Sequence, residues 1–138
     1  MAIPSPEPGH NMAGTEMRWE VVFHAEFLPE YRALTGQVQD ELVALTAILR
    51  KKGPLLGRPE VDTLKGSRYS NMKELRFEAD GGVWRIAFAF DPERKAILLV
   101  AGNKSGVGRD RFYRGLIRVA DRRFARHLKA LLSKERKQ

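Results

Sequence analysis

Residues 72–90, "MKELRFEADGGVWRIAFAF", contain the pattern that decides the fold. Apolar and polar side chains alternate in residues 72–79 and again in residues 83–90, as they do in strands that bury one face. Asp80-Gly81 between the two segments is a strong signal for a two-residue turn, because a type I′ turn needs positive φ at both central positions. The sequence therefore predicts an antiparallel β-hairpin.

The position of this turn also predicts the register of the hairpin. A two-residue loop pairs Phe77 with Trp84. It also pairs Leu75 with Ile86, so that apolar side chains meet apolar side chains, as a strand pair with one buried face requires. A slip of one residue would mix the two faces, whereas a slip of two residues would keep the faces but offset the pairs.

The same register places Arg76 directly opposite Arg85, on the other face of the hairpin. Two like charges in this position destabilise a strand pair by roughly a few tenths of a kcal/mol to about 1 kcal/mol. Ion pairs with Glu74 and Glu78 would relieve the repulsion. A bound anion would relieve it too, because each guanidinium can hold a phosphate through two hydrogen bonds. The spacing leaves both possibilities open.

The rest of the chain predicts an α+β domain around this hairpin. Alternation predicts a first strand at residues 18–23, and an unbroken apolar run predicts a central or two-sided strand at residues 96–103. Helical spacing predicts a helical hairpin within residues 26–52, with a break at Gly36, and a closing helix over residues 109–132. The predicted order is β-αα-β-β-β-α, with the first strand and the helical hairpin packed on a small antiparallel sheet.

The segments outside these elements have different expected roles. Residues 53–71 show no clear periodicity, so we expect a long loop, which in a compact domain is usually functional or disordered. Prolines and a lack of apolar residues predict a disordered leader at residues 1–16. The domain is then expected to span residues 17–132, followed by a basic tail at residues 133–138.

The overall composition excludes several classes of protein. Of the 138 residues, 43% are hydrophobic and 30% are charged, which fits one globular domain. The chain contains no cysteine, and hence no disulfide, thiolate metal site or cysteine nucleophile. No apolar run is long enough to span a membrane, and no signal peptide is visible. A cytoplasmic location without a membrane partner is expected.

Positive charge is concentrated in the second half of the chain. Residues 1–59 hold 6 Lys and Arg against 7 Asp and Glu, whereas residues 60–138 hold 19 against 10, which gives net charges of −1 and +9. Such asymmetry is typical of a protein with a polyanionic partner, most often a nucleic acid. An acidic protein partner is the alternative.

Several cations and one tyrosine are predicted to lie near the two hairpin arginines. Lys73 is close to them on the first hairpin strand, and Lys104 follows the last strand. Tyr113 lies on the first turn of the last helix, where the helix dipole favours anions. The candidate ligands for RNA or phosphate come from the loop and the last helix: Lys65, Arg68, Arg109, Arg111 and Arg114.

Two of these candidates belong to a basic stripe along the last helix, opposite its apolar stripe. Such a stripe is usually a solvated face. It would also suit contact with a nucleic-acid backbone or with an acidic segment of a protein partner. The stripe consists of Arg111, Arg114, Arg118, Arg122, Arg126 and Lys129.

A cation-rich site of this kind suits one metal-independent reaction, the attack of an RNA 2′-OH on its own phosphate. The substrate supplies the nucleophile, so the protein has to orient it, stabilise charge on the phosphorane oxygens and move protons. Arginines stabilise the charge, and a lysine whose pKa is lowered by neighbouring cations suits proton transfer. Tyr113 would stack on a base or take part in proton transfer. Neither a metal nor a cofactor is expected, because no His, Asp and Glu cluster has metal-ligand spacing.

Three segments carry a resemblance to a known family. They are "GPLLGRP-VD-LKGSR---NMKELR" within residues 53–76, "WRIAFAFDPERKAILLVAGNKSG" at residues 84–106 and "FYRGLIRVADRRFARHL" at residues 112–128. Together they closely resemble the HigB-like branch of the RelE/ParE superfamily of bacterial toxins from toxin–antitoxin modules. The resemblance extends over roughly residues 17–132, and its middle segment is specific.

The resemblance implies a small basic endoribonuclease, an mRNA interferase that cleaves mRNA on the ribosome without metal and so inhibits translation. A cognate antitoxin, commonly of the helix-turn-helix type and encoded next door, would neutralise it. Arg76 and Arg85 match the strand arginines of such toxins, and Lys104 matches the basic position after the last strand. Tyr113 matches an active-site aromatic near the start of the last helix. The general base is left open, because the double lysine of many relatives is missing.

Two other functions remain possible from the sequence. The first is a toxin of the ParE type, which inhibits DNA gyrase and cleaves no RNA. The second is a basic module that binds RNA or a protein partner without any catalysis. New 5′ ends on translated mRNA would separate the leading interpretation from both.

Overall fold

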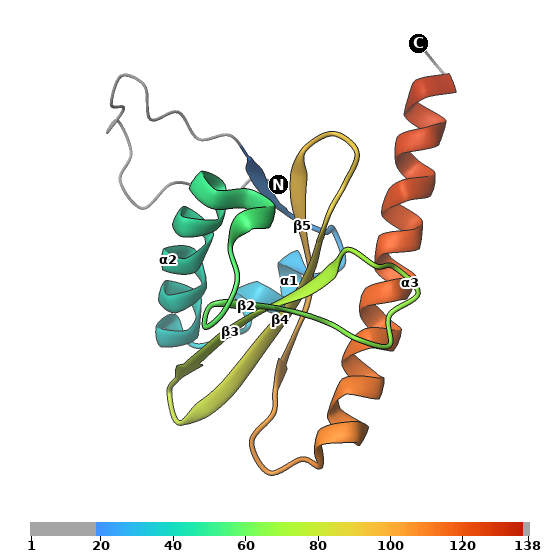
Figure 1. Ribbon diagram of the computed structural model, residues 1–138. Coiled ribbons are helices and arrows are strands. Elements are labelled where there is room, and N and C mark those ends of the chain that lie inside the picture. The colour runs from blue at the N-terminus through green and yellow to red at the C-terminus, as the bar shows by residue number, and fades with distance from the viewer. Residues whose placement is uncertain (1–18, 137–138) are drawn as a thin grey trace, which may run out of the picture.

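The computed structural model describes residues 19–136, which form an α+β domain built on one five-stranded sheet (Figure 1). The strand order in this sheet is β1-β5-β4-β3-β2. The predicted leader, residues 1–16, lies outside the described residues, whereas residues 133–136 of the predicted tail belong to the last helix. The elements in chain order are β1 (Glu20–Phe23), α1 (Leu28–Arg32), α2 (Gly36–Lys52), the 3-10 helix η1 (Gly53–Leu55), β2 (Val61–Thr63), β3 (Met72–Ala79), β4 (Gly82–Phe90), β5 (Lys95–Asn103) and α3 (Arg109–Arg136).

The hairpin of β3 and β4 has the predicted register. Leu75 pairs with Ile86 and Arg76 pairs with Arg85. The turn between the strands has φ of 52° at Asp80 and 73° at Gly81, the positive values that a type I′ turn requires. Turn chemistry and strand alternation therefore specify the same pairing.

The prediction of an antiparallel sheet is wrong at one edge. β1 pairs with β5 in parallel, with Val21 opposite Ala96, so the sheet is mixed. The two strands are joined by the whole intervening chain rather than by a tight turn. Alternation in a strand reports which side chains face the core, but it carries no information on strand direction.

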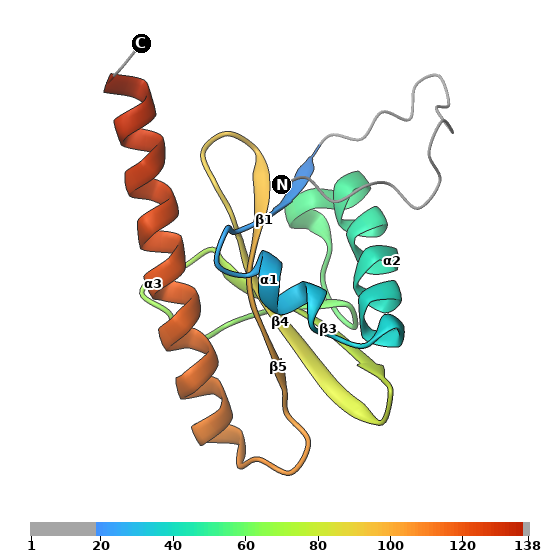
Figure 2. The same cartoon turned by 180° about the vertical axis from the view of Figure 1, so that it is seen from behind.

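Helices cover both faces of the sheet, α1 and α2 on one side and α3 on the other (Figures 1 and 2). The α2 face buries large apolar side chains such as Leu75, Ile86 and Phe88. The α3 face buries smaller sheet residues, including Ala87 and Ala89, against the apolar stripe of α3. The apolar β5 lies between β1 and β4 with both faces covered, which confirms the prediction of a central strand.

The predicted helical hairpin is reduced to one long helix with a short helix before it. α1 has 5 residues and α2 has 17. Gly36 does not break a helix but begins α2, after Thr35 in extended conformation. The side-chain amide of Gln39 donates hydrogen bonds of 3.0 and 3.4 Å to the carbonyl oxygens of Tyr31 and Arg32 at the end of α1. These bonds connect the two helices.

The segment from residue 53 to residue 71 is more ordered than the loop that the sequence predicts. It contains η1 and the edge strand β2, which pairs with β3. The segment is also attached to α3, because Asp121 accepts hydrogen bonds from the Ser67 hydroxyl at 2.5 Å and from the Arg68 amide at 3.0 Å. A strand of three residues is too short to produce a periodic pattern, which explains why it was not predicted.

An irregularity in β5 helps to hold α3 against the sheet. Ala87 pairs with Val100 and Phe88 pairs with Leu98, so Leu99 has no partner in the ladder of β4. Its carbonyl oxygen accepts a hydrogen bond of 2.8 Å from the guanidinium of Arg123 on α3. None of the helices within residues 19–136 is long and apolar enough to cross a membrane.

Candidate functional site

A pocket of about 330 Å³ opens between the β2–β3 edge of the sheet and the first turn of α3. Loop, sheet and helix each contribute charged side chains to it, so residues far apart in the sequence meet here. It is lined by Arg58, Asp62, Thr63, Leu64, Lys65, Glu74, Arg76, Arg109, Asp110 and Tyr113.

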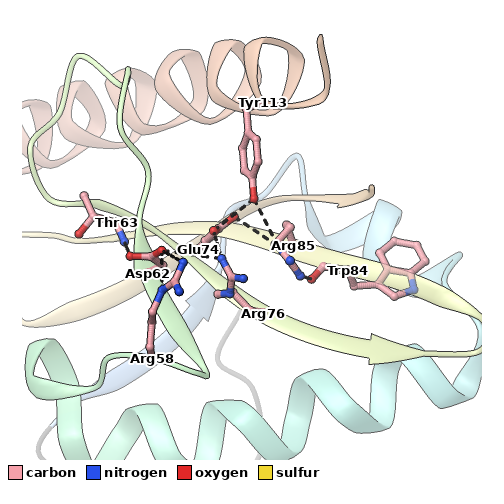
Figure 3. A network of polar contacts seen from close by, with 8 residues as sticks. All are labelled: Arg58, Asp62, Thr63, Glu74, Arg76, Trp84, Arg85 and Tyr113. Atoms are coloured by element: carbon pink, nitrogen blue, oxygen red, sulfur yellow. Dashed lines mark hydrogen bonds and ion pairs between the residues drawn. The ribbon is translucent and has the colours of Figure 1, made fainter. Parts of the chain in front are cut away.

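A row of alternating charges runs through this pocket and behind it (Figure 3). Two nitrogen atoms of Arg58 donate to Asp62 Oδ2 at 3.0 and 2.9 Å, and Asp62 lies 3.8 Å from Arg76. Arg76 donates to Glu74 Oε2 at 2.9 Å, and Glu74 Oε1 lies 3.7 Å from Arg85 Nε. Each carboxylate thus separates two guanidinium groups, which relieves the repulsion expected between the paired arginines.

Glu74 is the central member of this row. Its side chain is 4% exposed, and it lies between the two arginines that face each other across the hairpin. The sequence offered Glu74 and Glu78 as their partners. Glu74 pairs with both, whereas the exposed Glu78 lines a separate acidic hollow near the start of α2.

Arg76 and Arg85 have different positions in the site, although they face each other in the sheet. Arg76 lines the pocket, and its side chain is 25% exposed. The side chain of Arg85 is 8% exposed and lies behind Glu74, where it donates to the Trp84 carbonyl oxygen at 3.0 Å. Arg76 is therefore accessible to a phosphate that enters the pocket. Arg85 is not, because Glu74 lies between it and the pocket.

Tyr113 closes the site from α3. Its hydroxyl lies 3.3 Å from Arg85 Nε and 3.3 Å from Glu74 Oε2, so it accepts from the arginine and donates to the carboxylate. Burial, with the nearby Glu74 charge, raises the pKa of Tyr113 despite the opposing effect of Arg85. The phenol is therefore held neutral at physiological pH. Arg109 and Lys104 lie over its ring, with 5.4 and 5.6 Å from their charged groups to the ring centroid.

Lys104 follows β5 and is half-buried beside this cluster. Partial burial lowers its pKa, and the like charges of Arg85, Arg109 and Arg76 lower it further, with Glu74 acting in the opposite direction. A lysine with a lowered pKa releases its proton more readily, which is the property predicted for a proton-transfer residue at this position.

The remaining sequence candidates fall into three groups. Lys65 and Arg109 line the pocket, and Lys65 also lines an adjacent hollow of about 620 Å³ together with Arg114. Arg68 and Arg111 are exposed and line neither hollow. These two positions are available for contact with a large partner but do not contribute to the pocket.

Lys73 is not part of the pocket, contrary to its predicted position near the arginines. Strand alternation puts it on the side of Leu75, which packs against α2, and opposite to Glu74 and Arg76. The prediction relied on closeness in sequence, and it overlooked that adjacent residues of a strand point to opposite faces.

Besides Glu74, which the sequence suggested only as an ion-pair partner, three charged residues of the pocket were not proposed as site residues from the sequence. Arg58 and Asp62 lie in the segment predicted to be a loop, and Asp110 was not considered. The hydrogen bonds from Arg58 hold the pKa of Asp62 below its usual range. The order of charges along residues 58–62 was visible in the sequence, but their position opposite Arg76 depends on the pairing of β2 with β3. Within residues 19–136, no three His, Asp or Glu side chains are grouped so that they could hold a metal ion.

Comparison with known proteins assigns the family. Residues 29–125 match the family described as phage-derived protein Gp49-like (DUF891), which is more than half of the chain. The chain belongs to this Gp49-like family. All residues that line the pocket lie within the matched range, so the pocket is part of the Gp49-like domain.

Two proteins of Mycobacterium tuberculosis are similar to this Gp49-like chain. The one named "Putative toxin HigB2" is 52% identical over 96 residues, which are 69% of this chain and 47% of that protein. The one named "Putative toxin HigB3" is 46% identical over 91 residues, which are 66% of this chain and 77% of that protein. The matched region thus spans about half the length of HigB2. No solved structure significantly matches the chain. None of these descriptions mentions the RelE/ParE superfamily, so membership in it stays a prediction.

Proposed function

We propose that this protein is the toxin of a type II toxin–antitoxin module, and that it acts as a metal-independent endoribonuclease on mRNA at the ribosome. The similarity to two proteins named as toxins supports the first part. The observation that carries the second part is the pocket in which Arg58, Lys65, Arg76 and Arg109 surround a buried carboxylate and a tyrosine.

The pocket and the residues beside it supply positive charge and a proton donor for cleavage by a 2′-OH. Arg76 presents a guanidinium, held by Glu74, for the scissile phosphate, and Lys65 and Arg109 add positive charge to the same pocket. Tyr113 closes the α3 side, where a base of the RNA could stack on its ring. Lys104 does not line the pocket but lies beside it, over the Tyr113 ring, and with its lowered pKa it would protonate the leaving oxygen.

Exposed cations extend beyond the pocket in the direction of a larger partner. Lys65, Arg114 and Arg118 line the adjacent hollow, and Arg68 and Arg111 are exposed. We propose that this basic surface contacts RNA backbone of the mRNA or the ribosome, in the cytoplasm. The antitoxin would be the second partner, encoded by a neighbouring gene and commonly of the helix-turn-helix type.

The test is induced expression in a bacterial host with the 5′ ends of translated mRNA mapped afterwards. We expect growth arrest together with new 5′ ends inside coding regions, and we expect Arg76→Ala to abolish both. DNA damage without new mRNA ends would indicate gyrase inhibition instead. Binding of RNA that weakens with salt, without cleavage on ribosomes, would indicate a non-catalytic module.

A further inference from the structure

The hollow of about 620 Å³ beside the pocket shares a wall with it. Lys65, Asp110 and Tyr113 line both cavities, so the two cavities adjoin each other. The hollow falls within the range of about 300–1,000 Å³ that is usual for sites of small ligands. In RNA, a phosphate and the neighbouring base are separated by one ribose. Two adjoining cavities of this kind therefore suit two parts of one RNA strand.

Asp110 differs from the other two acids that line the pocket. Asp62 and Glu74 are each paired with arginine side chains. Asp110 is exposed on the first turn of α3, and its carboxylate makes no ion pair or hydrogen bond within residues 19–136. Its oxygen atoms are therefore available to a ligand in the hollow.

Arg114 lines the same hollow, one helical turn after Asp110. A separation of four residues is the spacing at which an acid and a cation commonly pair on the surface of a helix. In the part of the chain that the structure describes, however, these two side chains form no ion pair with each other. The hollow thus offers both a hydrogen-bond acceptor and a guanidinium donor to a ligand.

The remaining wall of the hollow is largely apolar. The side chains of Tyr113 and Ile117 are half-buried, and Gly66 contributes only backbone. A Cβ atom on Gly66 would lie 3.7 Å from Ile117 Cδ1, so the glycine lies close to the isoleucine. Proteins that recognise unpaired RNA bases combine such contact surfaces with hydrogen bonds to the base edges. The lining of this hollow has both properties.

We propose that this hollow is a guanine subsite, which binds a base next to the scissile phosphate in the pocket. The proposal rests on the proposed endoribonuclease function and adds a sequence preference to it. Asp110 would accept hydrogen bonds from the N1–H and N2–H groups of guanine, and Arg114 would donate to the O6 atom. Asp110 is thereby a specificity-determining residue.

The chemistry of the carboxylate selects guanine among the four RNA bases. An ionised carboxylate accepts hydrogen bonds and donates none. Guanine presents two adjacent N–H donors on its Watson–Crick edge, with a carbonyl oxygen beside them for a cation. Adenine and cytosine present an amino group next to an acceptor nitrogen, and uracil presents one N–H between two carbonyl oxygens. Each of these three bases would bring an acceptor against Asp110.

The charge around Asp110 favours RNA over a basic segment of a protein. Lys65, Arg114 and Arg118 line the hollow together with this one acid. They would repel the lysine or arginine side chain that Asp110 could otherwise bind, whereas they attract the phosphates on either side of a bound base.

The test compares the wild-type protein with Asp110→Ala in single-turnover cleavage of mRNAs on ribosomes. The mRNAs carry each of the four bases immediately before or immediately after the cleavage site. We expect the wild-type protein to prefer guanine at one of these positions by about 10–100-fold, and Asp110→Ala to lose most of this preference, because one bidentate contact supplies discrimination of that size. The ratio between bases is the readout, since removal of an acid from a basic surface strengthens the binding of every RNA.

Asp40→Ala is the matched control, because it makes the same change at an exposed helical position that lines neither cavity. It should keep the base preference of the wild-type protein. Inosine at the preferred position lacks only the N2 amino group of guanosine. We expect inosine to slow cleavage by the wild-type protein about 10-fold and to have little effect on Asp110→Ala, which has no carboxylate to receive that group.

The outcomes separate the two proposals. If the wild-type protein cleaves mRNA without a preference for guanine, or if Asp110→Ala keeps the full preference, the guanine subsite is wrong and the endoribonuclease function stands. Loss of antitoxin binding by Asp110→Ala with an unchanged base preference would show that the hollow binds a protein instead. If the wild-type protein cleaves no mRNA on ribosomes, both proposals are wrong.

Discussion

Arg85 and Arg123 are both buried arginines on the α3 side of the sheet, yet their surroundings differ. Each is 7% exposed. Arg123 makes two hydrogen bonds to the carboxylate of Glu30, at 2.8 and 2.6 Å, and a third to the Leu99 carbonyl oxygen. Arg85 lies 3.7 Å from its carboxylate, and its bond to Tyr113 is 3.3 Å long.

This difference separates a structural end of α3 from the end that holds the proposed site, called the functional end below. Around Arg123, α3 is fixed to the body by further pairs: Arg126 contacts Glu26 at 2.7 Å, and His127 contacts the buried Asp91 at 2.8 Å. Around Arg85 the contacts are longer, at 3.7 Å to Glu74 and 3.3 Å to Tyr113. Tight bidentate pairs favour rigidity, whereas looser contacts leave room for a ligand to compete for the same groups.

The largest effect expected from this comparison is on catalysis at the functional end. Arg85→Ala should slow mRNA cleavage about 100-fold, because small displacements of catalytic groups have effects of that size. Arg85 contacts Glu74 and Tyr113 without lining the pocket, so in the proposed endoribonuclease it holds these two side chains in place. Single-turnover rates, corrected for the folded fraction, measure the loss. A rate loss that follows the unfolded fraction alone would contradict the positioning role.

A slightly smaller effect, on stability, is expected at the structural end. Arg123→Ala removes the charged hydrogen bonds to Glu30 and leaves the Leu99 carbonyl without its donor, so we expect the free energy of unfolding to fall by about 2–3 kcal/mol. Cleavage per folded molecule should be unchanged. Denaturant unfolding measures the loss, with the exposed neighbour Arg122→Ala as a control expected to stay within about 0.5 kcal/mol of wild type. Equal losses in both variants would remove the distinction between the two ends.

At the functional end, the sequence predicted the pairing of the two strands but not the contacts between their side chains. The opposed arginines were predictable, because the Asp80-Gly81 turn and strand alternation impose one register. The same alternation was enough to show that the Lys73 side chain lies on the other face of the sheet and does not line the pocket. Glu74 shares the parity of Arg76 and was therefore visible as its neighbour, but its contacts with Arg85 and Tyr113 depend on two other elements, β4 and α3.

Other parts depend on tertiary contacts that have no local signal. Asp62 reaches the pocket only because the short β2 pairs with β3, and β1 lies parallel to β5 without a turn that would reveal it. In the sequence, nothing distinguished Arg123 from the exposed cations of the same basic helix. Its burial follows from the bulge at Leu99, which frees a carbonyl oxygen for it. Bulges and long-range ion pairs of this kind are set by the folded chain rather than by periodicity.

The packing between β5 and the first turns of α3 offers a third, smaller test. Gly102 pairs with Arg85, and a Cβ atom there would come within 2.8 Å of the Phe112 ring. Gly102→Ala should therefore push Phe112 and the adjoining Tyr113 outward and lower the free energy of unfolding by about 1–3 kcal/mol. Gly115→Ala is the control on α3, since nothing lies within 4 Å of its added Cβ, and it should stabilise the helix by about 0.5–1 kcal/mol. A stable Gly102→Ala variant with unchanged cleavage would show that this contact does not position Tyr113.

The smallest effect concerns pH at the structural end. Burial lowers the pKa of His24. The charge of Glu26 opposes this effect, whereas the charges of Arg123, His127 and Arg126 lower the pKa further. The His24 Nδ1 atom accepts a hydrogen bond of 3.1 Å from the Glu26 amide, which requires the neutral ring. His24 therefore binds a proton more readily in the unfolded chain than in the folded protein. Its contribution to stability is fully present above the unfolded pKa of about 6.5 and is lost as the pH falls below that value. His24→Asn keeps an acceptor without the titration, so its stability should decline less between neutral and mildly acidic pH. Parallel curves of unfolding free energy against pH for the two proteins would show that another group causes the decline.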